Sequence, residues 1–466
     1  MVQGRFFRKV AELKSQFDKS PSLPFAEVLG ESRLRGLLTE LKITFRDRIF
    51  NPWVTLWTFL SQVLSPEHSC IAAVARYLAF RAATEQPPCS ADTSSYCQAR
   101  QRLPVELVSR LVHDTGKDLH AQAPASWHSR GRPLKIVDGS TASMSDTPSN
   151  ANEFGKPGNQ KGGGAFPLLR LLVVLCLATG VVLEAALGKY RGKGTGELSL
   201  FRSLQDSFAP GDILLGDRLF CTYCDLARLR HKQVDAVFGL HASRKADFRR
   251  GRRLGKDDHV VVWQKPRSRP EWLSEEEFAA VPADMELREV RVRVQTKGFR
   301  VKKFVVVTTL TDAKQFSKDD IAAMYRQRWQ AELDLRSIKS VMQMDVLRCQ
   351  TPDMVRKEVW IHLLAYNLLR SVMCAAAEEE GLSVRELSFK ATLQLLNAFY
   401  HMIVTAAPHD LDSLCTTLLT AVKQHGVGQR PDRYEPRKRK RAAKPYPPLK
   451  LPRDKERKLC TVNRLG

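Results

Sequence analysis

The sequence lacks the features that would place the protein in a membrane or outside the cell. Its first twenty residues, MVQGRFFRKVAELKSQFDKS, contain neither an uninterrupted apolar stretch nor a small-residue cleavage site, so a secretory signal is not expected. The most apolar segment, AFPLLRLLVVLCLATGVVLEAAL, is interrupted by Arg170, Thr179–Gly180 and Glu184. It therefore predicts two buried strands joined by a turn and no transmembrane helix. We expect a soluble protein of the cytoplasm with no membrane partner.

The sequence also lacks the residue patterns of a structural zinc site, a disulfide framework and a P-loop that binds nucleoside triphosphates. The ten cysteines follow no regular framework, as expected for reduced thiols. Cys221 and Cys224 form one C-x-x-C, but a structural zinc site would need a second ligand pair, and no H-E-x-x-H occurs either. GKYRGKGTG is not a P-loop, because Gly188 and Gly192 are too close together and no Ser or Thr follows Lys193.

Acidic residues are few relative to basic ones. The 466 residues include 74 Lys and Arg against 50 Asp and Glu, which gives a formal net charge of +24. A basic surplus predicts a polyanionic partner, and nucleic acid is the leading candidate. The hydrophobic content of 43% is ample for packed domains, and a chain of this length is expected to form about three folded units.

One short segment, YRQRWQAELDLRSIK, carries polar residues at regular helical spacing. These residues are Tyr325, Arg328, Glu332 and Lys339. Residues seven apart on an α-helix of about 3.6 residues per turn return to nearly the same face, so the four are predicted to share one stripe of a single helix. The stripe could be an ordinary solvated face, in which Arg328 and Glu332 form a weakly stabilising i, i+4 pair.

Two aspartates upstream favour a functional interpretation. Asp138 and Asp217 each end an apolar run typical of a strand, in LKIVDGS and DILLGDR. These aspartates, followed by Tyr-x2-Arg-x3-Glu-x6-Lys, resemble the transposases of the insertion-sequence-four type over about residues 94–370. The resemblance implies a ribonuclease-H-like α/β core whose metal-binding, catalytic triad is Asp138, Asp217 and Glu332. The residues that it implies as DNA-phosphate contacts are Tyr325, Arg328 and Lys339.

The chemistry implied by the resemblance is cut-and-paste DNA transposition by metal-dependent phosphoryl transfer. Three carboxylates offer the hard oxygen ligands that Mg²⁺ prefers, and two ions could activate the nucleophile and stabilise the leaving oxygen. We expect two Mg²⁺ ions, for which Mn²⁺ can substitute. The expected partners are double-stranded DNA, as terminal inverted repeats and target, and a second copy of the chain in a synaptic dimer at the nucleoid. The alternatives are a nuclease of the same fold without strand transfer and a catalytically idle DNA-binding derivative.

Periodicity and composition divide the chain into four parts. Residues 1–126 are predicted to be helical, and the resemblance favours DNA binding over an otherwise equally plausible helical bundle. Residues 134–375 are the predicted mixed-sheet catalytic domain, with a β-rich insertion at about 238–300. Residues 380–425 are predicted helices that could support dimerisation. Residues 430–466 form a basic tail that includes PRKRKR and is predicted to be disordered.

A long loop is predicted directly after the first aspartate. The segment Gly139–Gly164 is rich in Ser, Asn, Gly and Pro, and loops of this length inside a compact domain are usually functional or disordered. Because it also carries Lys156 and Lys161, we predict that it contacts DNA.

Phe304 occupies a place where the resemblance implies a special aromatic residue. In relatives, a tryptophan at the start of the strand before the signature helix stacks on a base flipped out near the transposon end. That place in this sequence holds Phe304, whose ring can still stack on a base but has less area than an indole. An ordinary core role for Phe304 is equally consistent with the pattern.

Overall fold

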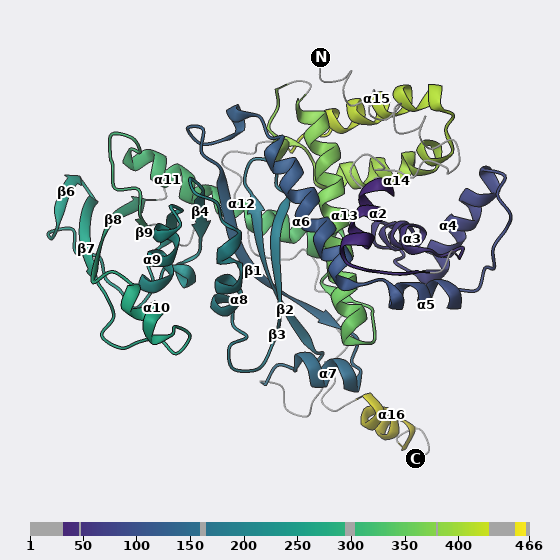
Figure 1. Cartoon of the computed structure of the whole chain (residues 1–466), viewed down its shortest axis with the longest axis horizontal. Coiled ribbons are helices and arrows are strands. Elements are labelled where there is room, and N and C mark those ends of the chain that lie inside the picture. Colours follow the sequence, from purple (N-terminus) through teal and green to yellow (C-terminus); the bar gives the residue numbers. More distant parts are fainter. Residues whose placement is uncertain are drawn as a thin grey trace.

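The fold is built around one ten-stranded mixed sheet with helices on both faces (Figure 1). The computed structural model describes residues 31–45, 48–158, 165–293, 303–378, 381–427 and 453–462. In Figure 1 the N-terminal helices lie to one side of the sheet and the β-rich insertion lies to the other. The candidate active-site residues come from the part between them.

The described portion of the N-terminal region is helical, as predicted. Its helices are α2 (Glu31–Glu40), α3 (Pro52–Leu64), α4 (Cys70–Ala83), α5 (Ser94–Arg102) and α6 (Val105–Ala121). Asn51 caps α3 and Ser69 caps α4, because each side chain accepts a backbone N–H that lacks a partner within the helix. α3 and α6 pack against the long helix α13 (Pro352–Glu378). The DNA-binding role of residues 1–126 stays a prediction.

Five strands form the centre of the sheet. They are β1 (Leu134–Met144), β2 (Leu168–Cys176), β3 (Val182–Lys189), β4 (Ile213–Gly216) and β5 (Asp235–Gly239). Their order is β3-β2-β1-β4-β5, with β2 antiparallel to both neighbours and with parallel pairing from β1 to β4 and from β4 to β5. This order with these directions is a ribonuclease-H-like core, so the predicted fold class is confirmed.

Alternate side chains of β1 enter two different hydrophobic cores, because successive side chains of a strand point to opposite faces. Ile136 packs with α6 and α13 on one face. Val137 packs on the other face with α8 (Glu197–Leu204) and α9 (Tyr223–His231). By the same alternation Asp138 belongs to the α13 face.

The β-rich insertion continues the same sheet. Its strands and helix, with the following core strand, are β6 (Arg252–Gly255), β7 (Asp258–Gln264), α10 (Glu275–Ala280), β8 (Asp284–Arg293) and β9 (Lys303–Thr308). β9 pairs antiparallel with β5, and β8, β7 and β6 follow in that order toward the edge. A buried ion pair anchors the insertion, since Arg288 donates to both carboxylate oxygens of Asp258 at 2.8 and 2.6 Å.

The long loop predicted for Gly139–Gly164 is wrong over most of its described length. β1 continues to Met144 because this stretch pairs with β2 and with the short strand β10 (Val346–Leu347). Thr147 then caps α7 (Pro148–Phe154), with a proline in the first turn. Long-range pairing therefore orders a segment whose composition resembles a loop.

The structure describes one of the two lysines on which the predicted DNA contact of that segment was based. Lys156 lies 2.6 Å from Asp146 in an ion pair, so its charge is already partly matched within the chain. Lys161 lies outside the described residues. DNA contact by this segment stays a prediction.

The C-terminal part is helical where it is described. After α13 come α14 (Phe389–Thr405), α15 (Pro408–Gln424) and α16 (Arg453–Val462). α16 lies within the tail predicted to be disordered, and the PRKRKR run lies outside the described residues. Within the described ranges α13 is the one helix long and apolar enough to cross a membrane. Because 78% of its most apolar window is buried inside the fold, it is a core helix and weak evidence for a membrane span.

Candidate active site

The two aspartates lie at the same level of the sheet. In the parallel register of β1 and β4, Ile136 is opposite Leu215, and two residues further along each chain are Asp138 and Asp217. Asp138 was predicted to end its strand, and this prediction is wrong. Asp138 lies in the middle of β1, where it is paired with Val173 of β2. β4 ends one residue before Asp217, so β1 has no parallel neighbour at this level. The end of β4 thus opens the sheet beside both carboxylates.

Tyr325 and Glu332 lie on two short helices. α11 (Lys318–Gln327) and α12 (Trp329–Arg336) are separated by Arg328. Arg328 keeps a helical backbone conformation, but its N–H donates to the Tyr325 carbonyl at 3.2 Å, three residues back. The single continuous helix predicted for this segment is therefore wrong.

Lys339 lies in a π-helical turn, Ser337–Val341, that directly follows α12. A π-turn contains more residues than an α-turn, so the regular spacing that would align Lys339 with Glu332 is lost. Its ammonium group forms no ion pair or hydrogen bond with any residue that the structure describes. No contact of the described residues links Lys339 to Tyr325, Arg328 or Glu332, and its contact with DNA phosphate stays a prediction.

Arg328 is the common partner of the predicted site. Its Nη2 lies 3.2 Å from Oε1 of Glu332 in an i, i+4 ion pair. Burial lowers the pKa of Arg328, but nearby acidic groups outweigh burial and raise it overall. Those groups are Tyr325, Asp217, Asp138 and Glu332. The structure thus brings both aspartates, the glutamate and the tyrosine around one guanidinium.

The buried carboxyl group of Asp138 has little positive charge beside it. Burial, with the charges of Glu332 and Asp217, raises the pKa of Asp138 to about 6, against the opposing effects of the Gly139 N–H and Arg328. The Gly139 amide donates to Oδ1 at 2.9 Å. A buried carboxylate is usually paired with a cation or bound to a metal, and here a single arginine serves three carboxylates.

The donor set fits a divalent cation that prefers oxygen. Asp138, Asp217 and Glu332 would supply carboxylate oxygens, the ligands that Mg²⁺ takes in proteins. As the side chains stand, no three His, Cys, Asp or Glu groups in the described ranges are close enough together to hold a metal ion. Glu332 is instead turned onto Arg328. Repulsion among carboxylates and attraction to Arg328 account for this arrangement.

Tyr325 is held in a tight place between strands and Arg328. A side chain at Gly239 would bring its Cβ within 2.6 Å of the Tyr325 hydroxyl, so only glycine leaves room for the phenol. Burial raises the pKa of Tyr325, although Arg328 acts to lower it, and the hydroxyl stays a donor at neutral pH. Phe304, at the start of β9, packs on the Tyr325 ring with centroids 5.1 Å apart. Its stacking on a flipped base stays a prediction.

Two apolar side chains beside Glu332 were not singled out in the sequence. Trp329 is 52% exposed and Leu333 is 40% exposed, and both flank Glu332 on α12. An exposed indole offers a stacking surface for a base. In the sequence, Trp329 and Leu333 could have been noticed as large apolar residues of a helix that do not belong to its buried apolar face.

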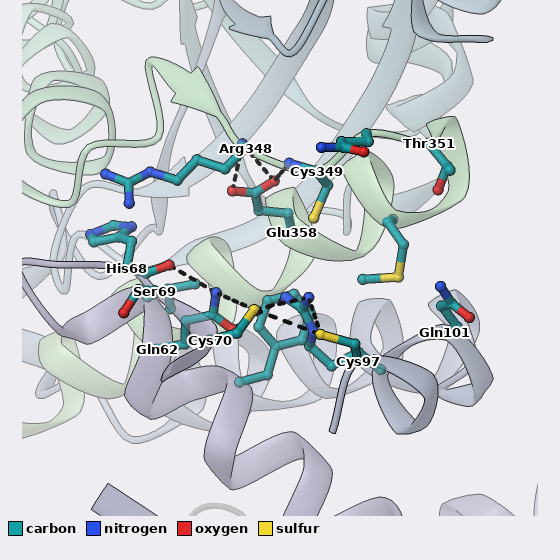
Figure 2. A pocket seen from close by; sticks show the side chains of 15 residues that line it. Gln62, His68, Ser69, Cys70, Cys97, Gln101, Arg348, Cys349, Thr351 and Glu358 are labelled. Atoms are coloured by element: carbon teal, nitrogen blue, oxygen red, sulfur yellow. Dashed lines mark hydrogen bonds between the residues drawn. The ribbon is translucent and has the colours of Figure 1, made fainter. Parts of the chain in front are cut away.

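A cavity of about 500 Å³ lies elsewhere, between α3, α4 and α5 and the start of α13 (Figure 2). Its polar groups are largely satisfied by the chain itself. Glu358 accepts the backbone N–H groups of Arg348 and Cys349, and Arg100 donates to the thiols of Cys70 and Cys97. None of the predicted site residues lines this cavity. A large hollow is therefore not the candidate active site of this molecule.

Comparison with known proteins places the chain in a family. The transposase DDE domain family matches residues 129–368, a range that contains Asp138, Asp217 and Glu332 together with the centre of the sheet. The chain belongs to this family. It is a DDE transposase, an enzyme of DNA transposition, and dependence on a divalent metal and on DNA is general in the family.

Individual transposases are similar to this chain. The transposase InsG of insertion sequence element IS4 from Escherichia coli (strain K12) is 28% identical over 364 residues, which cover 76% of this chain and 78% of InsG. The putative transposase InsZ from the same strain is 29% identical over 142 residues, or 30% of this chain and 46% of InsZ. The predicted resemblance to insertion-sequence-four-type transposases is confirmed.

One solved structure, a synaptic complex of the piggyBac transposase with hairpin DNA, is also similar. The match covers 84% of this chain and 81% of the piggyBac transposase chain, at 11% sequence identity. Its TM-score is 0.45, and a likeness of that degree bears on neither fold nor function.

Proposed function

We propose that this DDE transposase cuts DNA at the ends of its mobile element and joins those ends to target DNA, with Asp138, Asp217 and Glu332 as its metal ligands. One observation carries the proposal. The carboxylates of three separate elements act on a single guanidinium, that of Arg328, and leave a buried aspartate short of positive charge. Groups in such surroundings, beside the carboxyl end of a strand, are typical of functional sites.

The carboxylates would hold one or two Mg²⁺ ions, or Mn²⁺ in their place. Such ions polarise a phosphoryl oxygen and lower the pKa of a bound water or hydroxyl. The chain's own part is to bring oxygen ligands from β1, from the end of β4 and from α12 to one place. Because β4 stops before Asp217, the DNA strand can approach along the open side of β1.

Arg328 and Tyr325 would hold the DNA backbone. A guanidinium can bind a phosphate with two parallel hydrogen bonds, and a neutral phenol can donate one more. Because Arg328 is paired with Glu332 in the structure, a phosphate would offer it a second anion to bind. These contacts position the strand without reading its sequence. Lys339 would add a further phosphate contact after a local rearrangement of the π-turn.

The recognition of element ends would fall to the helices of residues 1–126 and to the insertion. Near β6 the insertion exposes Arg249, Arg250, Arg252 and Arg253, which suits a phosphate backbone. Transposition joins two ends, so we propose a dimer in the synaptic complex, formed with the helices of residues 380–425. The proposed location is the cytoplasm, on the nucleoid.

The proposal is tested by cleavage and joining of labelled element-end DNA in Mg²⁺. Asp138→Ala, Asp217→Ala and Glu332→Ala should each abolish cleavage while binding of the same DNA without metal is retained. Asp206→Ala is the matched control, because this carboxylate is 82% exposed in a surface ion pair. Cleavage at wild-type rate by any of the three variants would remove that residue from the site. Cleavage without joining would favour a nuclease of the same fold.

Phe304 has its own test, since we propose that it holds a flipped base while resting on Tyr325. Phe304→Ala should slow second-strand cleavage more than first-strand nicking, and an abasic nucleotide at the flipped position should partly restore the rate. The stacking contact is worth about 1–3 kcal/mol, so the effect on the second step should be roughly tenfold. A variant that only melts at a lower temperature, with an unchanged ratio of the two steps, would return Phe304 to the core.

A further inference from the structure

Asp334 lies two residues after Glu332 on α12 and has the opposite environment. The Asp334 side chain is 1% exposed, whereas the Glu332 side chain is 39% exposed. On an α-helix two residues correspond to a rotation of about 200°, so the two carboxylates project from opposite sides of α12. Any rotation of α12 about its axis that moved one carboxylate would move the other.

Two arginines bind the buried carboxylate of Asp334. Arg385, from the one-turn 3-10 helix Val384–Glu386, donates through Nη1 to both oxygens, at 2.7 and 2.6 Å. Arg370 of α13 also donates to Oδ1, through Nη2. The side chains of Arg370 and Arg385 are 5% and 13% exposed. Asp334 is thus held by two charged, largely desolvated donors from separate elements.

The same arginines are fixed to the turn between β2 and β3. Arg385 donates through Nε to the Leu177 carbonyl at 2.9 Å and through Nη2 to the Cys176 carbonyl at 3.2 Å. β2 is the antiparallel partner of β1 along the residues that include Asp138. One chain of hydrogen bonds therefore runs from α12 to the strand next to the first aspartate.

Arg370 reaches the same turn by a second route. Its Nε donates to the Tyr366 hydroxyl at 2.9 Å, and that hydroxyl donates to the Gly180 carbonyl at 2.8 Å. Gly180 has φ +77°, and a Cβ there would lie 2.8 Å from Cζ of Arg370. The turn is thus shaped by a glycine that lets the guanidinium lie directly against it.

The hydrogen-bonding pattern changes at both ends of α12, so contacts of its side chains act together with the backbone to set its rotation. The helix has eight residues, with a tighter i, i+3 hydrogen bond at Arg328 before it and the π-turn Ser337–Val341 after it. We propose that Asp334, through Arg370 and Arg385, is a positioning residue that sets the rotation of α12 and so aims Glu332 at the aspartates of β1 and β4. The inference rests on the proposed role of Glu332 as a metal ligand.

A purely structural role would give a different result. Removing one partner of a buried ion pair lowers the stability of the fold wherever the pair lies. A positioning role predicts in addition that metal binds more weakly at temperatures where the variant is fully folded. Residues that orient metal ligands typically change metal affinity by 10- to 100-fold when they are replaced.

The test measures Mn²⁺ binding to the complex of the full chain with element-end DNA, by the electron paramagnetic resonance signal of free Mn²⁺. The variants are Asp334→Asn and Arg385→Lys, and the latter keeps the charge but loses the planar fork. Asp206→Asn is the matched control on the surface. We expect both variants to bind Mn²⁺ about tenfold more weakly, with metal-free DNA binding unchanged. The Mn²⁺ concentration for half-maximal cleavage should rise in parallel.

Glu332→Gln separates this inference from the proposed function. If Glu332→Gln binds Mn²⁺ as the wild type does, the proposed ligand role fails. If Glu332→Gln weakens Mn²⁺ binding while Asp334→Asn and Arg385→Lys bind it normally when folded, the positioning role alone is overturned. Should Asp334→Asn fail to fold, Arg385→Lys decides the matter by the same measurement.

Discussion

The candidate active site and the cavity of Figure 2 are both polar, but they differ in how far their charged groups are paired within the chain. In the cavity, Glu358 accepts two backbone N–H groups at 2.9 to 3.0 Å, and Arg100 donates to two thiols and to Gln62. At the active site one guanidinium, Arg328, faces three carboxylates. Asp138 receives a single backbone N–H, and its pKa is raised to about 6, chiefly by burial.

The difference shows which property marks a site of chemistry in this molecule. The cavity has volume, but its charged groups already have partners within the chain, so nothing in it requires a ligand. The three carboxylates of the candidate active site share one arginine, so their negative charge exceeds the positive charge beside them. A cation and a phosphate together would complete that balance, and this is the ligand pair that a DDE transposase handles.

The largest effect should come from Asp138→Asn, which keeps the shape of the side chain and removes its charge. Loss of a metal ligand should lower the cleavage rate by about 1,000-fold or more, because the metal stabilises charge in the transition state by several kcal/mol. The stability of the metal-free protein should stay the same or rise, because burial disfavours the ionised form of Asp138. Single-turnover cleavage and urea unfolding measure the two effects. A variant that is destabilised and still active would reverse the assignment.

His68 should dominate the acid sensitivity of the cavity. Burial, with help from His362 and Arg348, lowers the pKa of His68 to about 4 from an ordinary value near 6.5. Because the folded state binds the proton less well than the unfolded state, stability is full above pH 6.5 and falls as the pH drops toward 4, by at most about 3 kcal/mol.

His68→Asn tests this assignment. Asparagine is tolerated at the φ of +53° found there. The slope of unfolding free energy between pH 6.5 and 4 should flatten in this variant, as measured by urea titration. An unchanged slope would show that another group causes the acid sensitivity.

Glu358→Gln makes the same change in the cavity that Asp138→Asn makes at the site. The amide would place N–H groups against backbone donors, so the folded state should lose about 2 kcal/mol. Cleavage per folded molecule should stay within twofold of wild type. Urea unfolding and active-site titration together measure both quantities. A large fall in turnover with normal stability would give the cavity a functional role and break the contrast between the two regions.

The sequence predicted which side chains the fold brings together around Arg328 better than it predicted the local structure that holds them. Asp138, Asp217 and Glu332 stood out because their motifs, order and spacing match those of insertion-sequence-four-type transposases, whereas helical spacing alone would also fit a solvated face. The alternation of strands and helices predicted a mixed α/β layer, and the resemblance to insertion-sequence-four-type transposases implied that this layer is a ribonuclease-H-like core.

What the sequence could not predict depends on contacts between distant segments. β1 continues past Asp138 because β2 and β10 pair with it, although its composition there resembles a loop. The break at Arg328 and the π-turn after α12 occur in a segment with regular helical spacing. Asp334 meets Arg370 and Arg385 only in the folded chain. None of these pairings leaves a periodic signal in the sequence.

The most direct way to test whether Asp138, Asp217 and Glu332 hold the metal is to locate the metal on the chain itself. Fe²⁺ would replace Mg²⁺ in the complex of the full chain with element-end DNA, and ascorbate with peroxide would generate hydroxyl radicals at the bound ion. If Asp138, Asp217 and Glu332 hold the ion, backbone breaks should appear near residues 138, 217 and 332, excess Mg²⁺ should suppress them, and Asp138→Ala should abolish them. Breaks confined to other segments, or breaks near these residues that persist in Asp138→Ala, would contradict this assignment.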